Sequence, residues 1–210
     1  MISAIFTVER GVTKVLLIKR KNEPFYGDWI LVGGALHNDE ELLAGAKREI
    51  KEKTGINEID LYEFKTFSRV DRSPIMRMVA VGYVGMLDSE KVSILRETEK
   101  TSNSDWFNID RIPKLGYDHE EILNEALIEL QKLIINTNIV KALFSNEATL
   151  PEIQKVYEAI LKKEFDRRNF RKKLLSLKLL EDTGKTKTFE GNKPAKLYRF
   201  NDTVGEKNVL

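Results

Sequence analysis

The 210-residue sequence contains no cysteine. That absence excludes disulfide bonds, a thiolate metal site and a cysteine nucleophile, and it suits a protein of the reducing cytosol. Histidine is nearly as scarce, because the chain has only two, His37 and His119, far apart in sequence. Metal centres draw several ligands together, so we expect both isolated histidines to be structural.

Long apolar runs are also missing. No stretch approaches 18 apolar residues without a charge, so no segment is expected to span a membrane. Residues 1–10 lack a basic segment followed by a long apolar one, which argues against a secretory signal peptide. Together these absences predict a cytoplasmic protein with no membrane partner.

Charge is distributed unevenly along the chain. The whole sequence carries 35 Lys and Arg against 33 Asp and Glu, a net charge of +2. Residues 150–210 hold 15 of those cations and 9 of the anions, which leaves 20 against 24 for residues 1–149. A basic C-terminal third joined to an acidic body predicts two domains, one of which meets a polyanion.

Apolar alternation and turn signals predict mixed α and β structure in the first part of the chain. The expected helices cover residues 39–54, with Asn38 or Asp39 as the N-cap and Gly55 closing the C-terminus, and residues 118–133. The expected strands cover residues 4–8, 14–18, 29–32, 61–67, 77–84 and 105–109.

The polar stretch 135–138 predicts a domain boundary, with one domain at residues 1–137 and another at 138–210. Thr149-x-x-Glu152 is a capping box with Pro151 in the first helical turn, so a helix is expected to begin there. A second helix and two strands around a turn complete the order of a winged helix-turn-helix. These three elements cover residues 166–177, 179–187 and 196–200.

The most specific pattern in the sequence is Gly34-x5-Glu40-x7-Arg48-Glu49-Ile50-x-Glu52-Lys53-x-Gly55-Ile56. It resembles the Nudix box at every fixed position except Lys53, where the family has glutamate. The resemblance implies an α+β protein whose residues 1–137 form a Nudix α/β/α sandwich with a mixed sheet. It also implies a ligand cleft and an Arg48 paired with a neighbouring glutamate such as Glu40.

The chemistry of the box depends on three carboxylates that share one helical face and hold Mg²⁺ against a diphosphate. Here those positions are Glu49, Glu52 and Lys53. Glu49 and Glu52 leave at most a weak metal site, because Lys53 can pair with Glu49 and repel a divalent ion. We therefore expect no required cofactor and no efficient hydrolysis, although Mg²⁺ would be used if hydrolysis is retained. A solvated amphipathic helix is the alternative explanation.

Further candidate ligand residues lie around a loop that precedes a predicted strand. Arginine there can meet a phosphate, and Arg72 lies in the same loop. The predicted ligand-binding residues are Gly34, Glu40, Arg69, Asp71 and Arg77. A charged surface loop is an equally good explanation of this arginine-rich segment.

The segment 166–177 has one apolar side and one basic side. At about 100° per residue, Phe170, Leu174 and Leu177 define the buried side of the helix. Arg168, Asn169 and Lys172 fall on the outward arc and carry the groups that read base edges in the major groove. Cations for phosphate contacts flank that arc or lie in the predicted wing: Arg167, Arg171, Lys173, Lys193 and Lys196. A basic helix that only solvates its domain is the alternative.

Residues 150–160, 166–172 and 193–200 are together similar to the C-terminal domain of the Nudix-related transcriptional regulators. That family includes repressors of NAD metabolism and regulators of pentose-sugar use. The resemblance implies a homodimer on a palindromic double-stranded DNA operator and a small phosphorylated effector, such as ADP-ribose or a sugar phosphate. The turn at residues 191–194 departs from the arginine-rich wing common in the family. The alternative is a Nudix hydrolase of ADP-ribose or another nucleoside diphosphate derivative.

Overall fold

The computed structural model describes residues 1–144, 147–188 and 194–201. Its internal contacts divide the chain into two compact units, Met1–Glu9 with Thr13–Glu129, and Arg10–Val12 with Leu130–Leu210. The sequence-based boundary at residues 137 and 138 stays a prediction, because the units divide within a helix. No helix of the described part is both long enough and apolar enough to cross a membrane.

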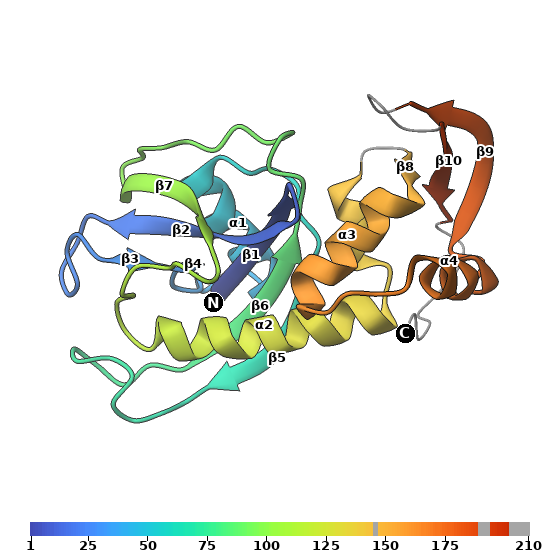
Figure 1. Cartoon of the computed structure of the whole chain (residues 1–210). Helices are drawn as coiled ribbons and strands as arrows, with labels where there is room; N and C mark the ends of the chain where they lie inside the picture. Colours follow the sequence, from blue (N-terminus) through green and yellow to red (C-terminus); the bar gives the residue numbers. More distant parts are fainter. Residues whose placement is uncertain (145–146, 189–193, 202–210) are drawn as a thin grey trace. The chain divides into compact units, whose positions relative to one another are not determined.

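The first unit is built on one mixed sheet (Figure 1). Its strands are β1 (Ile2–Glu9), β2 (Val12–Arg20), β3 (Trp29–Ile30), β4 (Val32–Gly33), β5 (Leu61–Phe67), β6 (Ala80–Met86) and β7 (Thr101–Asn108). The order is β3-β2-β1-β6-β5, with β4 paired to β1 and β7 paired to β2. Because β1 runs parallel to β6 while β5 runs antiparallel to it, the sheet is mixed as predicted.

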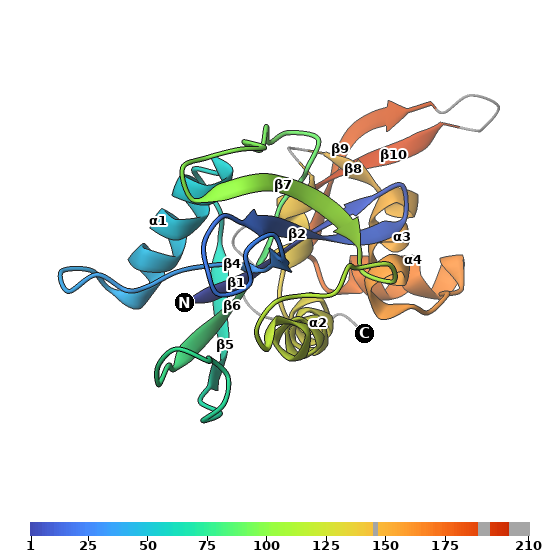
Figure 2. The same cartoon turned by 90° about the vertical axis from the view of Figure 1, so that its left-hand side faces the viewer.

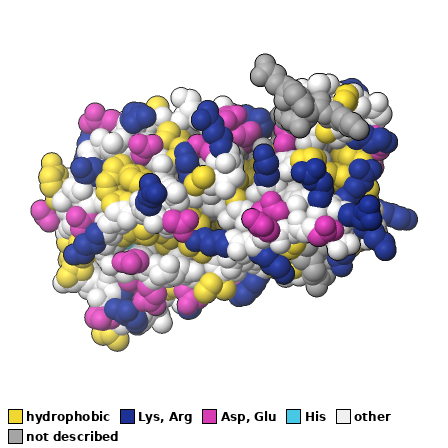
Figure 3. All heavy atoms as spheres, in the orientation of Figure 1, with side chains coloured by type: hydrophobic (Ala, Val, Ile, Leu, Met, Phe, Trp, Pro, Cys, Tyr) yellow, Lys and Arg dark blue, Asp and Glu magenta, His cyan; other side chains and the backbone are white. Residues whose placement is uncertain are grey.

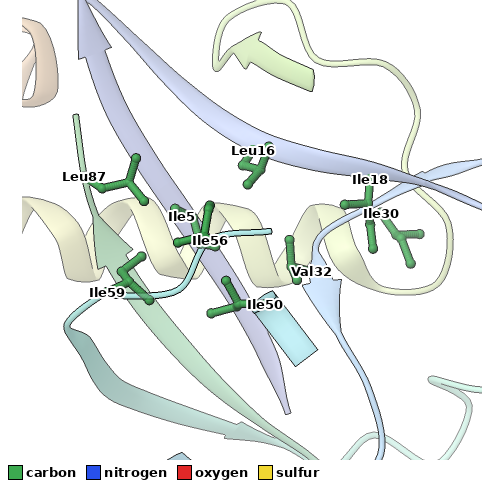
Figure 4. Close-up of a cluster of buried hydrophobic side chains, with 9 residues drawn as sticks. All are labelled: Ile5, Leu16, Ile18, Ile30, Val32, Ile50, Ile56, Ile59 and Leu87. Carbon is green, nitrogen blue, oxygen red and sulfur yellow. The ribbon is translucent and has the colours of Figure 1, made fainter. Parts of the chain in front are cut away.

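Two helices flank this sheet. The sheet lies between α1 (Leu42–Thr54) and the first half of α2 (His119–Asn136), as Figures 1 and 2 show. On the α1 side, Ile50 packs into a cluster of buried aliphatic side chains drawn from the strands and the loop after α1 (Figure 4). The cluster comprises Ile5, Leu16, Ile18, Ile30, Val32, Ile50, Ile56, Ile59 and Leu87. The predicted three-layer sandwich is confirmed.

Several local predictions for the first unit have wrong bounds: β6 begins at Ala80 and not at residue 77, and β7 begins at Thr101 and not at residue 105. Two further differences have a visible physical cause. The helix α1 begins at Leu42 and not at residue 39, because Glu40 turns back to accept a hydrogen bond from the backbone N–H of His37 at 2.8 Å. The strand predicted at 29–32 is broken at Leu31, whose N–H donates to Nδ1 of His119 at 3.0 Å. Gly55 does close α1, with the left-handed φ of 78° that favours glycine.

The second unit has the predicted order of a winged helix. Its elements are a 3-10 helix η1 (Ile139–Leu143), β8 (Ala148–Thr149), α3 (Leu150–Leu161), α4 (Arg167–Ser176), β9 (Leu180–Lys187) and β10 (Ala195–Phe200). β9 and β10 pair antiparallel, and β8 adds a third strand beside β10. The predicted turn at 190–194, including Lys193, lies almost entirely outside the described residues.

Helix ends in the second unit follow local sequence signals. Thr149 and Glu152 form the predicted reciprocal capping box at the start of α3. Asp166 caps α4 by accepting from the backbone N–H of Asn169 at 2.9 Å. The two helices are held together by Tyr157 and Phe170, whose ring centroids lie 5.5 Å apart in an edge-to-face arrangement.

Candidate ligand cavity and nucleic-acid interface

The first unit contains a cavity of about 550 Å³. Four cationic side chains line it: Arg20, Lys53, Arg72 and Arg77. Apolar and aromatic side chains form other parts of the wall: Ile30, Leu36, Met78, Val79, Val81 and Tyr117. A small anionic ligand that also carries an apolar or ring-shaped part matches this lining.

Gly34, a predicted ligand residue, lies in the wall of this cavity. A Cβ atom at Gly34 would collide with the carboxylate of Glu49, which is buried behind it. Glycine leaves room for that carboxylate, whereas a larger residue would push it from its present position. The first fixed glycine of the box thus has a packing reason as well as a place at the cavity.

Arg48 holds the loop before α1 in place. Its guanidinium donates to both carboxylate oxygens of Glu40, at 2.9 and 2.6 Å, and to the carbonyl oxygen of Ala35 at 3.0 Å. The hydrogen bonds from Arg48 hold the pKa of Glu40 well below its ordinary value, at about 2. The predicted Arg48–Glu40 pair is therefore present. Glu40 itself is absent from the cavity lining and acts on the loop.

The Arg48–Glu40 pair predicts a defined pH dependence. A carboxyl whose pKa is depressed by folding contributes stability above its ordinary pKa of 4.5, and that contribution is lost as the pH falls toward 2. We expect wild type to exceed Glu40→Gln in melting temperature by a steady margin above roughly pH 5.5, with the margin vanishing near pH 2. Thermal unfolding of both proteins across this range measures it. A margin that persists unchanged at pH 2 contradicts the assignment.

Lys53 occupies the position where the box otherwise carries glutamate. Its ammonium lies 3.0 Å from Glu49 Oε2 and donates to the carbonyl oxygen of Gly33. Burial lowers the pKa of Lys53 while Glu49 opposes that effect, and the Lys53 and Glu49 side chains are 11% and 5% exposed. Burial raises the pKa of Glu49, but Lys53 and Arg48 outweigh it and the net shift is downward. The predicted ion pair is confirmed, and it is buried.

Glu52, the other carboxylate on this face of α1, also pairs with a cationic side chain of the chain. Lys100 lies 2.5 Å from Glu52 and 4.0 Å from Glu49, and its hydrogen bond lowers the pKa of Glu52. Arg48 additionally donates to Glu49 at 2.8 Å. The described residues contain no group of three carboxylate or histidine side chains placed to hold a metal ion. A divalent ion does not fit here, because Lys53 and Lys100 already neutralise Glu49 and Glu52.

The arginine-rich loop separates into a surface part and a cavity part. Arg69 is exposed and pairs with Asp71 and Glu121, and neither Arg69 nor Asp71 lines the cavity. Arg77 does line it and donates to the carbonyl oxygen of Arg69 at 2.8 Å. Arg72 also lines it and makes a bidentate pair with Asp118, at 2.9 and 3.0 Å.

Most residues of the cavity wall were not identified as ligand candidates from the sequence, and three of them carry polar or aromatic groups: Arg20, Tyr117 and His119. Arg20 ends β2 and stacks over the ring of Tyr117, with its guanidinium carbon 5.4 Å from the centroid. His119 begins α2, accepts from Leu31, and stacks on Tyr117 at 5.4 Å. Burial and the charge of Arg72 lower the pKa of His119 to about 3, so it is neutral. His119 is structural, as expected, and also forms part of the cavity wall.

In the second unit, α4 presents a basic surface. Phe170 and Leu174 are buried at 4% and 1% exposure, whereas Leu177 is only half-buried. All six predicted polar positions on the helix are exposed: Arg167, Arg168, Asn169, Arg171, Lys172 and Lys173. In Figure 3 Lys and Arg side chains gather over this end of the unit. This exposed basic side of α4 is accessible to a polyanion.

The predicted wing contributes less accessible charge. Lys196 is exposed, and its ammonium is paired with Asp182 across the hairpin at 2.6 Å. A phosphate would have to compete with that carboxylate. Nearer the helices, a hollow of about 510 Å³ is lined by Arg167, Arg168 and Arg171 of α4 together with residues at the start of α3.

Comparison with known proteins agrees with both units. The NUDIX domain family model matches residues 2–126, and the NrtR DNA-binding winged helix domain model matches residues 140–200. The chain is 31% identical to the ADPR responsive transcriptional repressor NtrR of Acinetobacter baylyi over 94% of its own length and 79% of that protein. The chain belongs to the Nudix-related transcriptional regulators. This assignment confirms the family resemblance that was based on the Nudix box and on residues 150–160, 166–172 and 193–200.

Solved structures of such regulators match the fold closely. The crystal structure of Shewanella oneidensis NrtR complexed with a 27mer DNA has a TM-score of 0.84 and 28% identity, covering 98% of this chain and 95% of that one. The NUDIX domain of the same protein complexed with ADP ribose has a TM-score of 0.56 and 26% identity, covering 61% and 85%. This Nudix-related regulator therefore has a DNA-binding winged helix and a Nudix domain.

Proposed function

We propose that this chain is an ADP-ribose-responsive transcriptional repressor. The observation that carries the DNA-binding half is the open face of α4, where Arg168, Asn169 and Lys172 are exposed while Phe170 and Leu174 anchor the helix. A capped helix with one buried stripe can enter the major groove of a double-stranded operator without unfolding its own core. Arg168, Asn169 and Lys172 would read base edges there.

Phosphate contacts supply the remaining affinity. The exposed side of α4 that carries Arg168, Asn169 and Lys172 is called the reading face, and Arg167, Arg171 and Lys173 flank it. Arg167 and Arg171 also line the hollow between the starts of α3 and α4. Lys196 would reach a phosphate by leaving Asp182, and Lys193 would add a wing contact from outside the described residues. The ADPR responsive repressor of Acinetobacter baylyi and the NrtR of Shewanella oneidensis complexed with a 27mer DNA support this assignment.

The cavity of the first unit is the proposed effector site. ADP-ribose carries two negative phosphates between ring systems, and the lining offers Arg20, Lys53, Arg72 and Arg77 beside apolar walls. We include Gly34 and Arg77 from the sequence-based set and add Arg20 and Arg72. Glu40, Arg69 and Asp71 are assigned to the support of the surrounding loops. Binding needs no divalent metal, because Lys53 supplies positive charge where the ion would lie.

The proposed function also implies an oligomeric state, a cellular location and a division of roles between two domains. A repressor that recognises a palindromic operator acts as a homodimer, and its DNA places it in the cytoplasm of a bacterial-type cell. We place the functional domain boundary between residues 137 and 138, because α2 ends at Asn136 and the winged-helix match begins at residue 140. Residues 1–137 would then sense the effector and residues 138–210 would bind DNA.

The DNA-binding assignment is tested by removing one reading side chain at a time. Arg168→Ala and Lys172→Ala are each expected to weaken binding to the promoter duplex upstream of this chain's own gene by about 1–3 kcal/mol. Lys51→Ala, an exposed lysine on α1 of the first unit, removes the same charge outside the winged-helix unit and is expected to have little effect. Gel-shift titrations measure all three, and unchanged affinity in both α4 variants contradicts the recognition-helix assignment.

A Nudix hydrolase of ADP-ribose or a related nucleoside diphosphate is the second candidate, since hydrolases of this family generally use divalent metal. The Lys53–Glu49 pair is the feature against it, because it occupies the carboxylate face that the metal would need. Formation of AMP and ribose 5-phosphate from ADP-ribose with Mg²⁺ separates the two functions. Robust turnover would favour the hydrolase, whereas binding without turnover favours the sensor.

A further inference from the structure

The ion pair between Arg72 and Asp118 connects the cavity to the start of α2. Arg72 lines the cavity, and its side chain is 3% exposed. Its Nε and Nη2 atoms donate to the two carboxylate oxygens of Asp118, whose side chain is 5% exposed. A guanidinium has only a few donors in a fixed fork, so a phosphate that takes the same edge must displace the carboxylate.

Asp118 is tied to the first turn of α2. Its carbonyl oxygen accepts the hydrogen bond from the N–H of Ile122 at 3.1 Å, so Asp118 directly precedes the helix and is bonded to its first turn. The preceding residue, Tyr117, lines the cavity and has a φ of 57°, a conformation that costs free energy in a non-glycine residue. A change of partner at Arg72 therefore acts on a strained helix start.

The other end of α2 is bonded within the winged-helix unit. Residues up to Glu129 belong to the first unit, and the helix continues from Leu130 to Asn136 in the second. There Gln131 donates from its side-chain amide to the carbonyl oxygen of Ile160, in the last turn of α3, at 3.0 Å. Leu130 and Ile134 of the same half are fully buried.

The turn between α3 and α4 is bonded back to α3. Gln154 donates to the carbonyl oxygen of Phe165 at 2.8 Å, and the N–H of Phe165 donates to the carboxylate of Glu158 at 3.0 Å. Phe165 immediately precedes Asp166, the N-cap of α4. A displacement of the last turn of α3 is thus passed to the start of α4 through fixed contacts.

We propose that a phosphate of the bound effector exchanges with Asp118 as the partner of Arg72, and that the released helix start passes the signal through α2, Gln131 and α3 to α4. This relay rests on the proposed function and names its regulation. The effector changes operator affinity because it favours the state in which the Arg72–Asp118 pair is open, while the unliganded chain favours the closed pair.

Asp118→Asn tests the entry point of the relay. The variant removes the competing charge, so we expect it to bind ADP-ribose several-fold more tightly than wild type. Its operator affinity without ligand is expected to shift in the direction that ADP-ribose shifts the wild type, because the open pair resembles the liganded state. Asp105→Asn, in the exposed pair with Arg96 and away from the cavity lining, is the matched control and should behave like wild type.

Gln131→Ala tests transmission without touching either binding site. We expect its ADP-ribose affinity to stay within about twofold of wild type, while the ligand-induced change in operator affinity, on the order of fivefold or more in wild type, shrinks toward none. Asn124→Ala removes an exposed polar side chain from the same helix and should keep the full response. Calorimetry with ADP-ribose and fluorescence anisotropy with the promoter duplex, each done with and without the other ligand, supply the measurements.

The outcomes separate the relay from the proposed function. A wild-type chain that binds neither ADP-ribose nor the duplex contradicts the proposed function, and the relay falls with it. A wild-type chain that responds, together with Gln131→Ala and Asp118→Asn variants that respond equally well, contradicts the relay alone. Should Asp118→Asn fail to fold because Arg72 is left buried without its partner, the Gln131→Ala result decides by itself.

Discussion

Replacing Lys53 with glutamate is expected to lower the free energy of unfolding by about 3–5 kcal/mol when no divalent metal is present. The ammonium of Lys53 is almost fully buried and lies 3.0 Å from Glu49. The substitution removes that pair and puts a second carboxylate beside Glu49, so two negative charges would repel each other in a region of low dielectric constant. The loss is therefore larger than for an ordinary surface lysine.

Mg²⁺ is expected to restore part of that stability. With glutamate at position 53 three carboxylates share one face of α1, and a hard divalent ion prefers such oxygen ligands. Denaturant unfolding of wild type and Lys53→Glu in EDTA and in Mg²⁺, followed by the fluorescence of Trp29 and Trp106 in the first unit, measures both effects. Lys51→Glu makes the same charge change on the exposed side of the same helix. If Lys53→Glu loses no stability in EDTA and gains none from Mg²⁺, the account of the altered box is wrong.

The contacts of the box were predictable in two ways. The Arg48–Glu40 pair was implied by the resemblance to the Nudix box, because Glu40 lies in the loop before α1 and Arg48 lies within the helix. Glu49 and Lys53 lie four residues apart on one helix. Helical spacing places such partners near each other whatever the rest of the chain does. The same reasoning located the capping box of α3, where the bond between Thr149 and Glu152 spans three residues.

The lining of the cavity was predictable only in part. Arg20, Arg72 and His119 come from the end of a strand, a loop and a helix start that are distant in sequence. No helical or strand period relates these positions, so only the folded sheet brings them together. Nothing in the spacing of Arg69 and Arg72 indicates which arginine turns inward. The outcome depends on Asp118, 46 residues further along the chain, which pairs with Arg72.

Local propensity also failed where a tertiary bond competes with the regular backbone pattern. The run Trp29–Val32 has the composition of one strand, but the N–H of Leu31 is taken by His119 and the ladder is interrupted. Asn38 and Asp39 are good N-cap types, yet the loop is held by Arg48 and Glu40, which delays α1 to Leu42. In both places a more distant residue forms the hydrogen bond: His119 bonds the backbone N–H of Leu31, and Arg48 bonds the carboxylate of Glu40.

Phe170→Ala is expected to destabilise the winged-helix unit by about 3–5 kcal/mol. The ring is 4% exposed and lies between Tyr157 and Phe165, with centroid distances of 5.5 and 5.7 Å. Truncation leaves a cavity between α3 and α4 that rigid aromatic neighbours cannot fill. Because the reading face of α4 depends on this anchor, operator affinity should fall with the folded fraction of the unit.

Leu177→Ala is the matched comparison, because helical spacing and the folded structure predict different losses of stability for it. The wheel places Leu177 on the same buried side as Phe170, but α4 ends at Ser176 and Leu177 is only half-buried at its C-cap. Truncation there is expected to cost on the order of 1 kcal/mol, since less apolar surface is returned to water. Amide hydrogen exchange in α3 and α4 measures both losses within the second unit. Equal losses for the two variants would mean that α4 continues through Leu177 and that its face turns differently toward DNA.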